Sequence, residues 1–188
     1  MLLNNSPMFS VPLIHIKVNN WKSKKIKLLS LIDESLLHPA DGGMDLVTND
    51  YRPQYDDPDL MGMHNINVQN ILGEEIREFM NASDSTSVEI LMSWFETCNK
   101  TEWHGIHNHG PVGYSAVCFI QYNPEVHKPT QFVSPFSNFV TGSIIEHSPS
   151  DVDEGSLIFF PASIHHYTLP NVSDEVRIIM SFNLKINV

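Results

Sequence analysis

The sequence has few cysteines, few basic residues and no long apolar run. Its two cysteines, Cys98 and Cys118, are too few for a disulfide framework, so a reducing, cytoplasmic setting is expected. Lys and Arg number 11 against 22 Asp and Glu, a formal charge of −11. That balance disfavours nucleic acid, whose phosphates are bound by Lys and Arg. No stretch approaches the ~20 apolar residues of a membrane span, and the first residues lack the features of a secretory signal, so no membrane partner is expected.

The length and hydrophobic content of the chain fit one globular domain. The chain has 188 residues, of which 41% are hydrophobic, enough for a sizeable core. Apolar residues at helical spacing predict helices over 23–37, with Ser23 as N-cap, and over 67–81. A loosely alternating segment, 8–18, precedes them, and the polar segment 39–64 is expected to be irregular and could cover a binding pocket.

From Ser87 onward the hydrophobic period changes to two, which is typical of strands. The later strands are expected at 102–107, 113–122, 130–134, 142–147, 156–160, 165–168 and 175–188. This order predicts an α+β protein: an antiparallel barrel or jelly roll, about 88–188, with an N-terminal extension, 1–87, whose helices pack on it.

Two groups of histidines point to a metal site. His107 and His109 stand two apart at a strand end, so both side chains share a face. Two imidazoles at that spacing can tilt onto one ion, and His166, after an apolar strand and Pro161, is the natural third donor. Three protein ligands leave open positions for small molecules, which is the catalytic pattern rather than the structural one.

The other histidines are weaker candidates. His165 is expected to point opposite to His166 by strand alternation, and His104 could line the pocket or replace another ligand. The remaining histidines are isolated and receive no role: His15, His38, His64, His127 and His147.

Arg177 lies eleven residues after His166 in a strongly apolar strand. A guanidinium there is costly unless its charge is paired. A dicarboxylate ligand would supply a bidentate partner. The sequence therefore links a metal site with a carboxylate-binding site in one barrel.

This arrangement resembles the 2-oxoglutarate/Fe(II)-dependent dioxygenases, in particular the small prolyl-hydroxylase-like group common in marine phages. The resemblance covers about residues 88–185. The matching segments are the Trp94 strand, His107-Asn108-His109, Ser115-Ala116-Val117, Gly155 to Pro161, His166, Pro170-Asn171, Arg177 and Ser181-Phe182-Asn183. The start, Met8 to Pro12, is also similar to the starts of family members.

The resemblance implies a double-stranded β-helix and an enzyme that uses Fe(II), 2-oxoglutarate and O2, hydroxylating its substrate and releasing succinate and CO2. His107 and His166 would bind iron, His109 stands where most relatives carry Asp or Glu, and Arg177 would bind the distal carboxylate of 2-oxoglutarate. The location would be the cytoplasm, that of the host for a phage-encoded protein.

Three positions depart from the family's pattern. No acid stands two after His107, so either three histidines bind the metal, or water, an anion or an acid from elsewhere takes the position. Ile179 stands where relatives often place the Ser that shares the carboxylate, and Phe119 where they often have Tyr. Hydroxyl groups that could replace them belong to Ser181, Tyr114, Tyr122 and Tyr167.

Two other functions compete with this interpretation. A cupin-like three-histidine metalloenzyme would not use 2-oxoglutarate; the H-x-H favours it and Arg177 disfavours it. A non-catalytic metal-binding barrel is favoured by the missing acid and by Ile179. The primary substrate, a peptide or a small molecule, is not defined by the sequence, and a homodimer is a further possibility.

Overall fold

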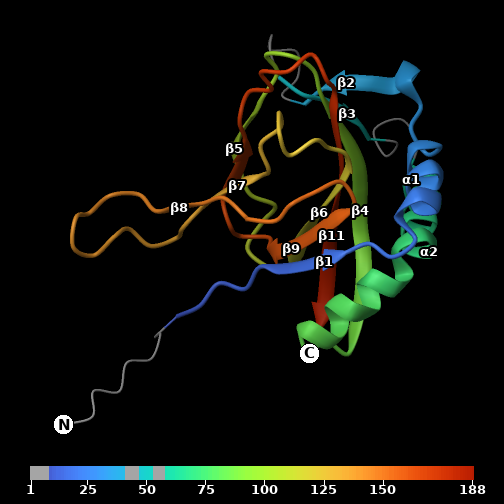
Figure 1. Ribbon diagram of the computed structural model, residues 1–188. Coiled ribbons are helices and arrows are strands. Elements are labelled where there is room, and N and C mark those ends of the chain that lie inside the picture. Colours follow the sequence, from blue (N-terminus) through green and yellow to red (C-terminus); the bar gives the residue numbers. More distant parts are fainter. Residues whose placement is uncertain (1–8, 41–46, 53–57) are drawn as a thin grey trace.

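The computed structural model describes residues 9–40, 47–52 and 58–188 as two stacked antiparallel sheets with helices on one side (Figure 1). The larger sheet has the strand order β1-β9-β6-β11-β4-β3-β2 and the smaller one β5-β10-β7-β8. The chain runs through β1 (Ile14–Lys17), α1 (Trp21–Leu29), β2 (Leu37–Pro39), β3 (Asn49–Tyr51), α2 (Pro58–Ala82), β4 (Ser87–Cys98), β5 (His104–His107), β6 (Tyr114–Gln121), β7 (Gln131–Val133), β8 (Glu146–His147), β9 (Ser156–Pro161), β10 (His166–Thr168) and β11 (Arg177–Asn187).

Strand alternation divides the apolar side chains between two core layers. Phe159 points toward the helices, where its ring stacks on Phe79 of α2 at 4.3 Å between centroids. Its neighbour Phe160 points into the space between the sheets and meets Phe132 of β7 at 4.8 Å. The inner face of the larger sheet is thus closed by the smaller sheet and its outer face by α1 and α2, which confirms the predicted helix-covered double-stranded β-helix.

The helices differ from their predicted bounds. The first ends at Leu29 instead of residue 37 and is preceded by Asn20 in a left-handed conformation (φ 52°), so the prediction of Ser23 as N-cap is wrong. The second begins at Pro58, nine residues before its expected start, because proline is well suited to the first helical turn. Within the segment expected to be irregular, residues 49–51 pair with β4 as strand β3; its parts 41–46 and 53–57 lie outside the described residues.

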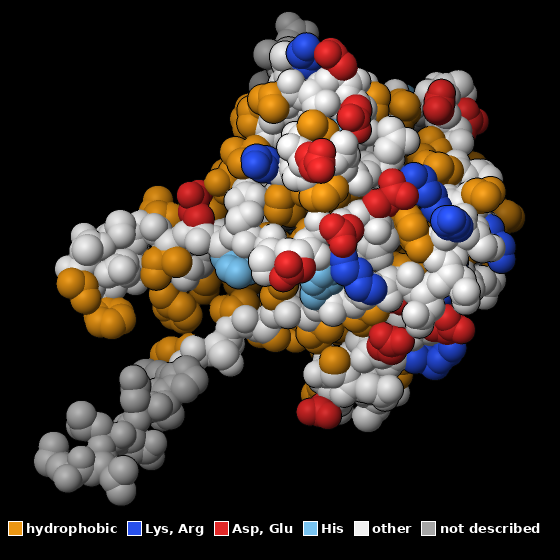
Figure 2. Space-filling model, in the orientation of Figure 1, with side chains coloured by type: hydrophobic (Ala, Val, Ile, Leu, Met, Phe, Trp, Pro, Cys, Tyr) orange, Lys and Arg blue, Asp and Glu red, His pale blue; other side chains and the backbone are white. Residues whose placement is uncertain are grey.

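The strands of the second half follow the prediction closely, with β8 as the exception. Strand structure there is confined to Glu146 and His147, although 142–147 was expected. The preceding segment, 134–145, leaves the barrel as a long arm without a charged residue (Figures 1 and 2). Its hydrophobic side chains include Phe139, which is 99% exposed, whereas Phe136 stacks on Phe9 at 5.5 Å between ring centroids. In the described ranges, no helix is long and apolar enough to cross a membrane.

Candidate active site

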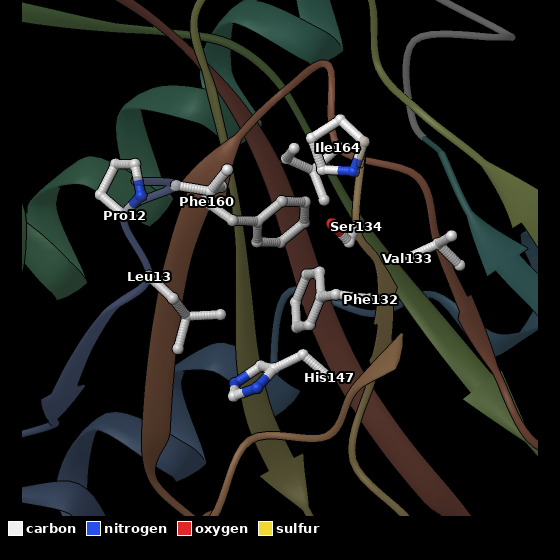
Figure 3. A pocket seen from close by; sticks show the side chains of 10 residues that line it. Pro12, Leu13, Phe132, Val133, Ser134, His147, Phe160 and Ile164 are labelled. Atoms are coloured by element: carbon white, nitrogen blue, oxygen red, sulfur yellow. The ribbon is translucent and has the colours of Figure 1, made fainter. Parts of the chain in front are cut away.

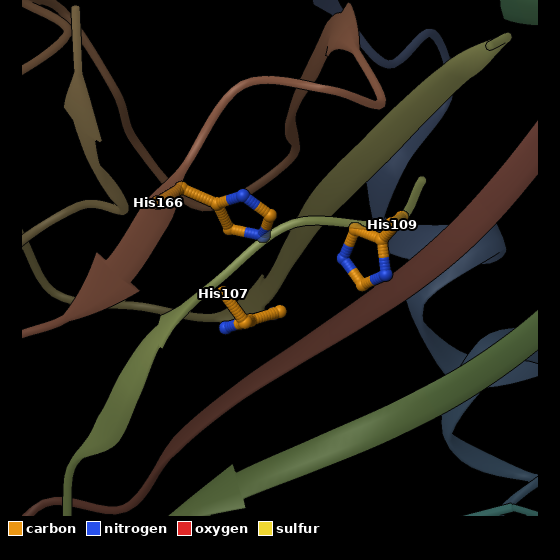
Figure 4. A group of neighbouring side chains, drawn as sticks. All are labelled: His107, His109 and His166. Carbon is orange, nitrogen blue, oxygen red and sulfur yellow. The ribbon is translucent and has the colours of Figure 1, made fainter. Parts of the chain in front are cut away.

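The pairing of β5 with β10 brings the three predicted histidines together. His166 lies directly opposite His107 in this antiparallel pair, and their ring centroids are 4.3 Å apart. His109 follows on the segment after β5, with its ring 5.0 Å from each of the other two. One ligand nitrogen from each residue lies within 4.8 Å of the others (Figure 4). That spacing suits three nitrogens on one face of an ion at ~2.1 Å from each.

Backbone carbonyls determine which imidazole nitrogen faces this space. The Nδ1 of His107 lies 2.8 Å from the carbonyl oxygen of Gly105, and the Nδ1 of His166 lies 3.0 Å from that of Ile164. A carbonyl oxygen only accepts, so Nδ1 carries the hydrogen in both residues. The Nε2 lone pair is therefore available for a metal, and the ring is oriented by a second interaction, as is usual for metal-binding histidines.

Two of these imidazoles are kept neutral. Burial, followed by the nearby His107 ring, lowers the pKa of His109 to about 4 and that of His166 to about 3. Neutral imidazole is the form that binds a metal.

His109 also packs beside Trp94, at 5.3 Å between ring centroids, and the guanidinium of Arg52 lies 5.4 Å from the same indole. Within the described residues, the group that unites the three imidazoles contains no carboxylate. The donor set nevertheless fits Fe(II), because imidazole is a good ligand for iron.

Arg177 is positioned next to this centre by β11. Its side chain is 2% exposed, and its Nη2 donates to the Thr168 hydroxyl at 3.3 Å. Since Thr168 pairs with His104 on β5, the guanidinium spans from the larger sheet to the smaller one. Its Nε and Nη1 have no hydrogen-bond partner among the described residues. Two unmatched buried donors on one guanidinium fit the carboxylate of a ligand such as 2-oxoglutarate.

A second buried group lies beside the first, and the sequence indicated only its histidine, His104, and neither of its two acids. It consists of Asp50 from β3, Glu96 from β4 and His104 from β5, whose ligand atoms also lie within 4.8 Å of one another. Glu96 Oε2 lies 2.7 Å from His104 Nδ1, and the His104 ring stacks on that of His107 at 4.4 Å. The two carboxylates already have cationic neighbours, because Arg52 pairs with Asp50 and Arg177 lies beside Glu96. We therefore interpret this group as a charge network and not as a second metal site.

The hydroxyl group that contacts Arg177 is not one that the sequence indicated. It belongs to Thr168. Tyr167 instead donates to Glu146 at 2.8 Å, and Tyr114 packs edge-on against Phe79. Among the histidines, His165 is exposed and turned away from His166, as strand alternation predicted.

An apolar cavity of about 450 Å³ lies between the segment that precedes β1 and the strands β7 and β9 (Figure 3). Its lining includes Leu13, Phe132, His147 and Phe160. None of the three clustered histidines lines it, but Phe160 is 4.8 Å and Phe132 6.1 Å from the His166 ring between centroids. The two phenyl rings therefore separate the cavity from the histidine centre. Phe159, the neighbour of Phe160 on β9, is part of the core under the helices.

Comparison with known proteins supports the same class. A family model described as "Putative 2OG-Fe(II) oxygenase" matches residues 92–183, which include all three histidines and Arg177. No curated protein sequence matches.

Solved structures share the fold at low sequence identity. The alpha ketoglutarate dependent carbocyclase SnoK from nogalamycin biosynthesis superposes with a TM-score of 0.68 at 10% identity, covering 93% of this chain and 79% of that one. HygX from Streptomyces hygroscopicus, solved with nickel, 2-oxoglutarate and hygromycin B, gives 0.60 at 12% identity, with 93% and 82% covered. A Pseudomonas putida prolyl-4-hydroxylase gives 0.53 at 13% identity, with 93% and 92% covered.

The fold and the family match together define an oxygenase that depends on 2-oxoglutarate and Fe(II). Residues 92–183, just under half of the chain, match the model of the 2OG-Fe(II) oxygenase family. These findings favour the use of 2-oxoglutarate over the cupin-like alternative, which would not use it. They do not define the primary substrate.

Proposed function

We propose that His107, His109 and His166 are the iron ligands of this oxygenase and that Arg177 binds the distal carboxylate of 2-oxoglutarate. The observation that carries the proposal is the convergence of three imidazoles beside a buried guanidinium with two unmatched donors. The chemistry that bound Fe(II) supplies is activation of O2, coupled to oxidative decarboxylation of 2-oxoglutarate to succinate and CO2.

The residues of the chain perform three tasks in this scheme. The carbonyls of Gly105 and Ile164 hold His107 and His166 in the tautomer that offers Nε2. Arg177 orients the co-substrate by a charge-assisted bidentate contact. Phe132 and Phe160 shield the side of His166 that faces the apolar cavity, which limits access of water to the reacting atoms.

We further propose that the primary substrate is neutral or cationic. The formal charge of −11 disfavours polyanions. Hydroxylation requires the reacting carbon to reach the open face of the three-histidine centre. A panel of neutral, cationic and anionic peptides and small molecules, assayed for substrate-dependent succinate formation, tests this class, and stimulation by anionic compounds alone would contradict it.

The ligand set is tested by single substitutions with a matched control. We expect His107→Ala and His166→Ala to abolish metal-dependent 2-oxoglutarate binding and succinate formation under aerobic conditions with Fe(II). His165→Ala alters an exposed neighbour and should leave both unchanged. Arg177→Met should keep metal binding and weaken 2-oxoglutarate binding by ~10²-fold or more, as expected for the loss of charge-assisted hydrogen bonds. Unaltered metal binding in His107→Ala and His166→Ala would refute the ligand assignment.

A further inference from the structure

The arm ends in a turn that is held by its own hydrogen bonds. The side-chain oxygen of Asn138 accepts from the backbone amides of Val140 and Thr141 at 2.9 and 3.0 Å. The backbone carbonyl of Asn138 accepts from the amide of Gly142 at 2.7 Å. At this tip, Phe139 is 99% and Val140 80% exposed. Because the turn is already ordered, a partner that binds these two side chains has little further ordering to impose.

Exposed apolar side chains continue along the arm, as the space-filling view shows (Figure 2). They belong to Phe136, Phe139, Val140, Ile144 and Ile145. A contiguous apolar surface of this kind marks an interaction site on a soluble protein. The side chains of two such arms carry on the order of 1,000 Å² of apolar surface, which reaches the scale of a specific interface.

A complementary hollow lies at the foot of the arm. The apolar cavity of about 450 Å³ includes Ser134 and Pro135, the first two residues of the arm, in its lining (Figure 3). Leu13, Phe132 and Ile164 supply apolar walls, and none of the described lining residues is Lys, Arg, Asp or Glu. The volume lies in the range of cavities that enclose an apolar ligand group.

The charge distribution favours a second copy of the chain as the partner. The chain has a formal charge of −11, so two copies repel each other over most of their surface. The arm and the cavity lining carry no acidic or basic residue, and they can approach each other without this cost. A lipid surface fits less well, because the arm offers no Lys or Arg to lipid headgroups.

The position of the cavity gives such a contact twofold symmetry. Two arms that lie side by side in opposite directions bring the tip of each to the foot of the other, which is where the cavity lies. Each copy then gives a tip and receives one, as in an isologous interface. We propose that this chain forms a twofold dimer in which Phe139 and Val140 of each copy occupy the apolar cavity of the other.

Analytical ultracentrifugation of the full chain measures the association. We expect a monomer–dimer equilibrium with a Kd in the micromolar range. Phe139→Asp places a charge at the tip, and it does not disturb the fold of one copy because that side chain is exposed. We expect it to weaken dimerisation by about 30-fold or more, as for an aromatic side chain at the centre of an interface. Ile26→Asp on α1 alters a residue that is 71% exposed and should leave the dimer unchanged.

A mixed cross-link tests where the tip lies. Chains with Phe139→Cys are mixed with chains with Val11→Cys, a partly exposed residue of the cavity lining, and the thiols are oxidised with copper phenanthroline. The native cysteines, Cys98 and Cys118, are buried. We expect a disulfide-linked product with one copy of each variant, which only a contact between two chains can give. Chains with Ile26→Cys in place of Val11→Cys should give no mixed product.

Three outcomes would overturn the proposal. The first is a chain that stays monomeric as its concentration is raised. The second is a dimer that is equally stable in Phe139→Asp, or one without the mixed cross-link, because the tip would then lie outside the partner's cavity. The third is a monomer that binds phosphatidylcholine vesicles and loses this binding in Phe139→Asp, which would assign the arm to a lipid surface.

Discussion

Acidification is expected to destabilise the metal-free protein through the buried imidazoles of His64 and His166 and the half-buried imidazole of His109. The Nδ1 of His64 lies 2.6 Å from the Ser93 hydroxyl oxygen, and its Nε2 has no hydrogen-bond partner in the described chain. Burial lowers the pKa of His64 to about 4. Burial, with the charge of His107, does the same for His109 and His166, to about 4 and 3.

The direction in which stability changes with pH depends on whether the folded or the unfolded state binds protons at the higher pH. The unfolded imidazoles take up protons near pH 6.5, while the folded ones do so near pH 4 or below, so the folded state is disfavoured as the pH falls through this window. Above pH 6.5 the full contribution is present. For His64 alone, the shift from 6.5 to about 4 corresponds to about 3 kcal/mol. Each imidazole contributes a slope of up to about 1.4 kcal/mol per pH unit within the window.

Urea denaturation of the metal-free chain at pH 7, 6 and 5 measures this loss. We expect the free energy of unfolding to fall with pH, and the slope to be smaller in His64→Gln by up to about 1.4 kcal/mol per pH unit. His38→Gln removes an exposed histidine and should keep the original slope. Stability that does not change between pH 7 and 5, or an unchanged slope in His64→Gln, would refute the assignment of neutral buried imidazoles.

Substitutions at three positions probe the centre and its scaffold. His109→Asp should give a two-histidine, one-carboxylate set that retains Fe(II) at least as tightly as the unaltered chain, measured by competition with a metal chelator, whereas His109→Ala should weaken metal binding by tenfold or more. Lys24→Met leaves the fully buried Glu75 carboxylate without its cationic partner at 2.8 Å and should cost about 3–5 kcal/mol in urea denaturation. Gly155→Ala should destabilise by more than 1 kcal/mol, because Gly155 has φ +82° and an added Cβ would lie 2.9 Å from the Trp21 ring.

The glycine and lysine substitutions each have a matched control. Gly142→Ala also changes a glycine with positive φ, but an added Cβ there has no atom within 4 Å, so it separates backbone strain from collision with Trp21. Lys27→Met removes a lysine from the same helix without an ion pair among those found in the described residues. Equal losses for Lys24→Met and Lys27→Met, or for the two glycine variants, would contradict the expected causes. An Fe(II) affinity in His109→Ala equal to that of the unaltered chain would remove His109 from the ligand set.

The histidine centre can be predicted from the sequence because it depends on short-range features, namely residue spacing along one strand and one turn. His107 and His109 share a face at i and i+2, and the turn at Pro161 returns the chain so that His166 pairs opposite His107. The helix bounds were less predictable, since a helix is stabilised by tertiary packing of its apolar face and its first turns can be largely polar. The exposed arm, 134–145, likewise has no periodic signal that distinguishes it from a strand pair.

Glu96 and Asp50 were missed for a different reason. Asp50 lies in a segment expected to be irregular, and only the β3–β4 register places it opposite Glu96, 46 positions later in the sequence. Glu96 itself carried a signal, because it follows Trp94 by two on a buried strand and so points into the same interior. A charge in an apolar strand needs a partner, and this requirement holds for Glu96 as it does for Arg177. Applied to both residues, this requirement predicts that the two strands place opposite charges in one interior.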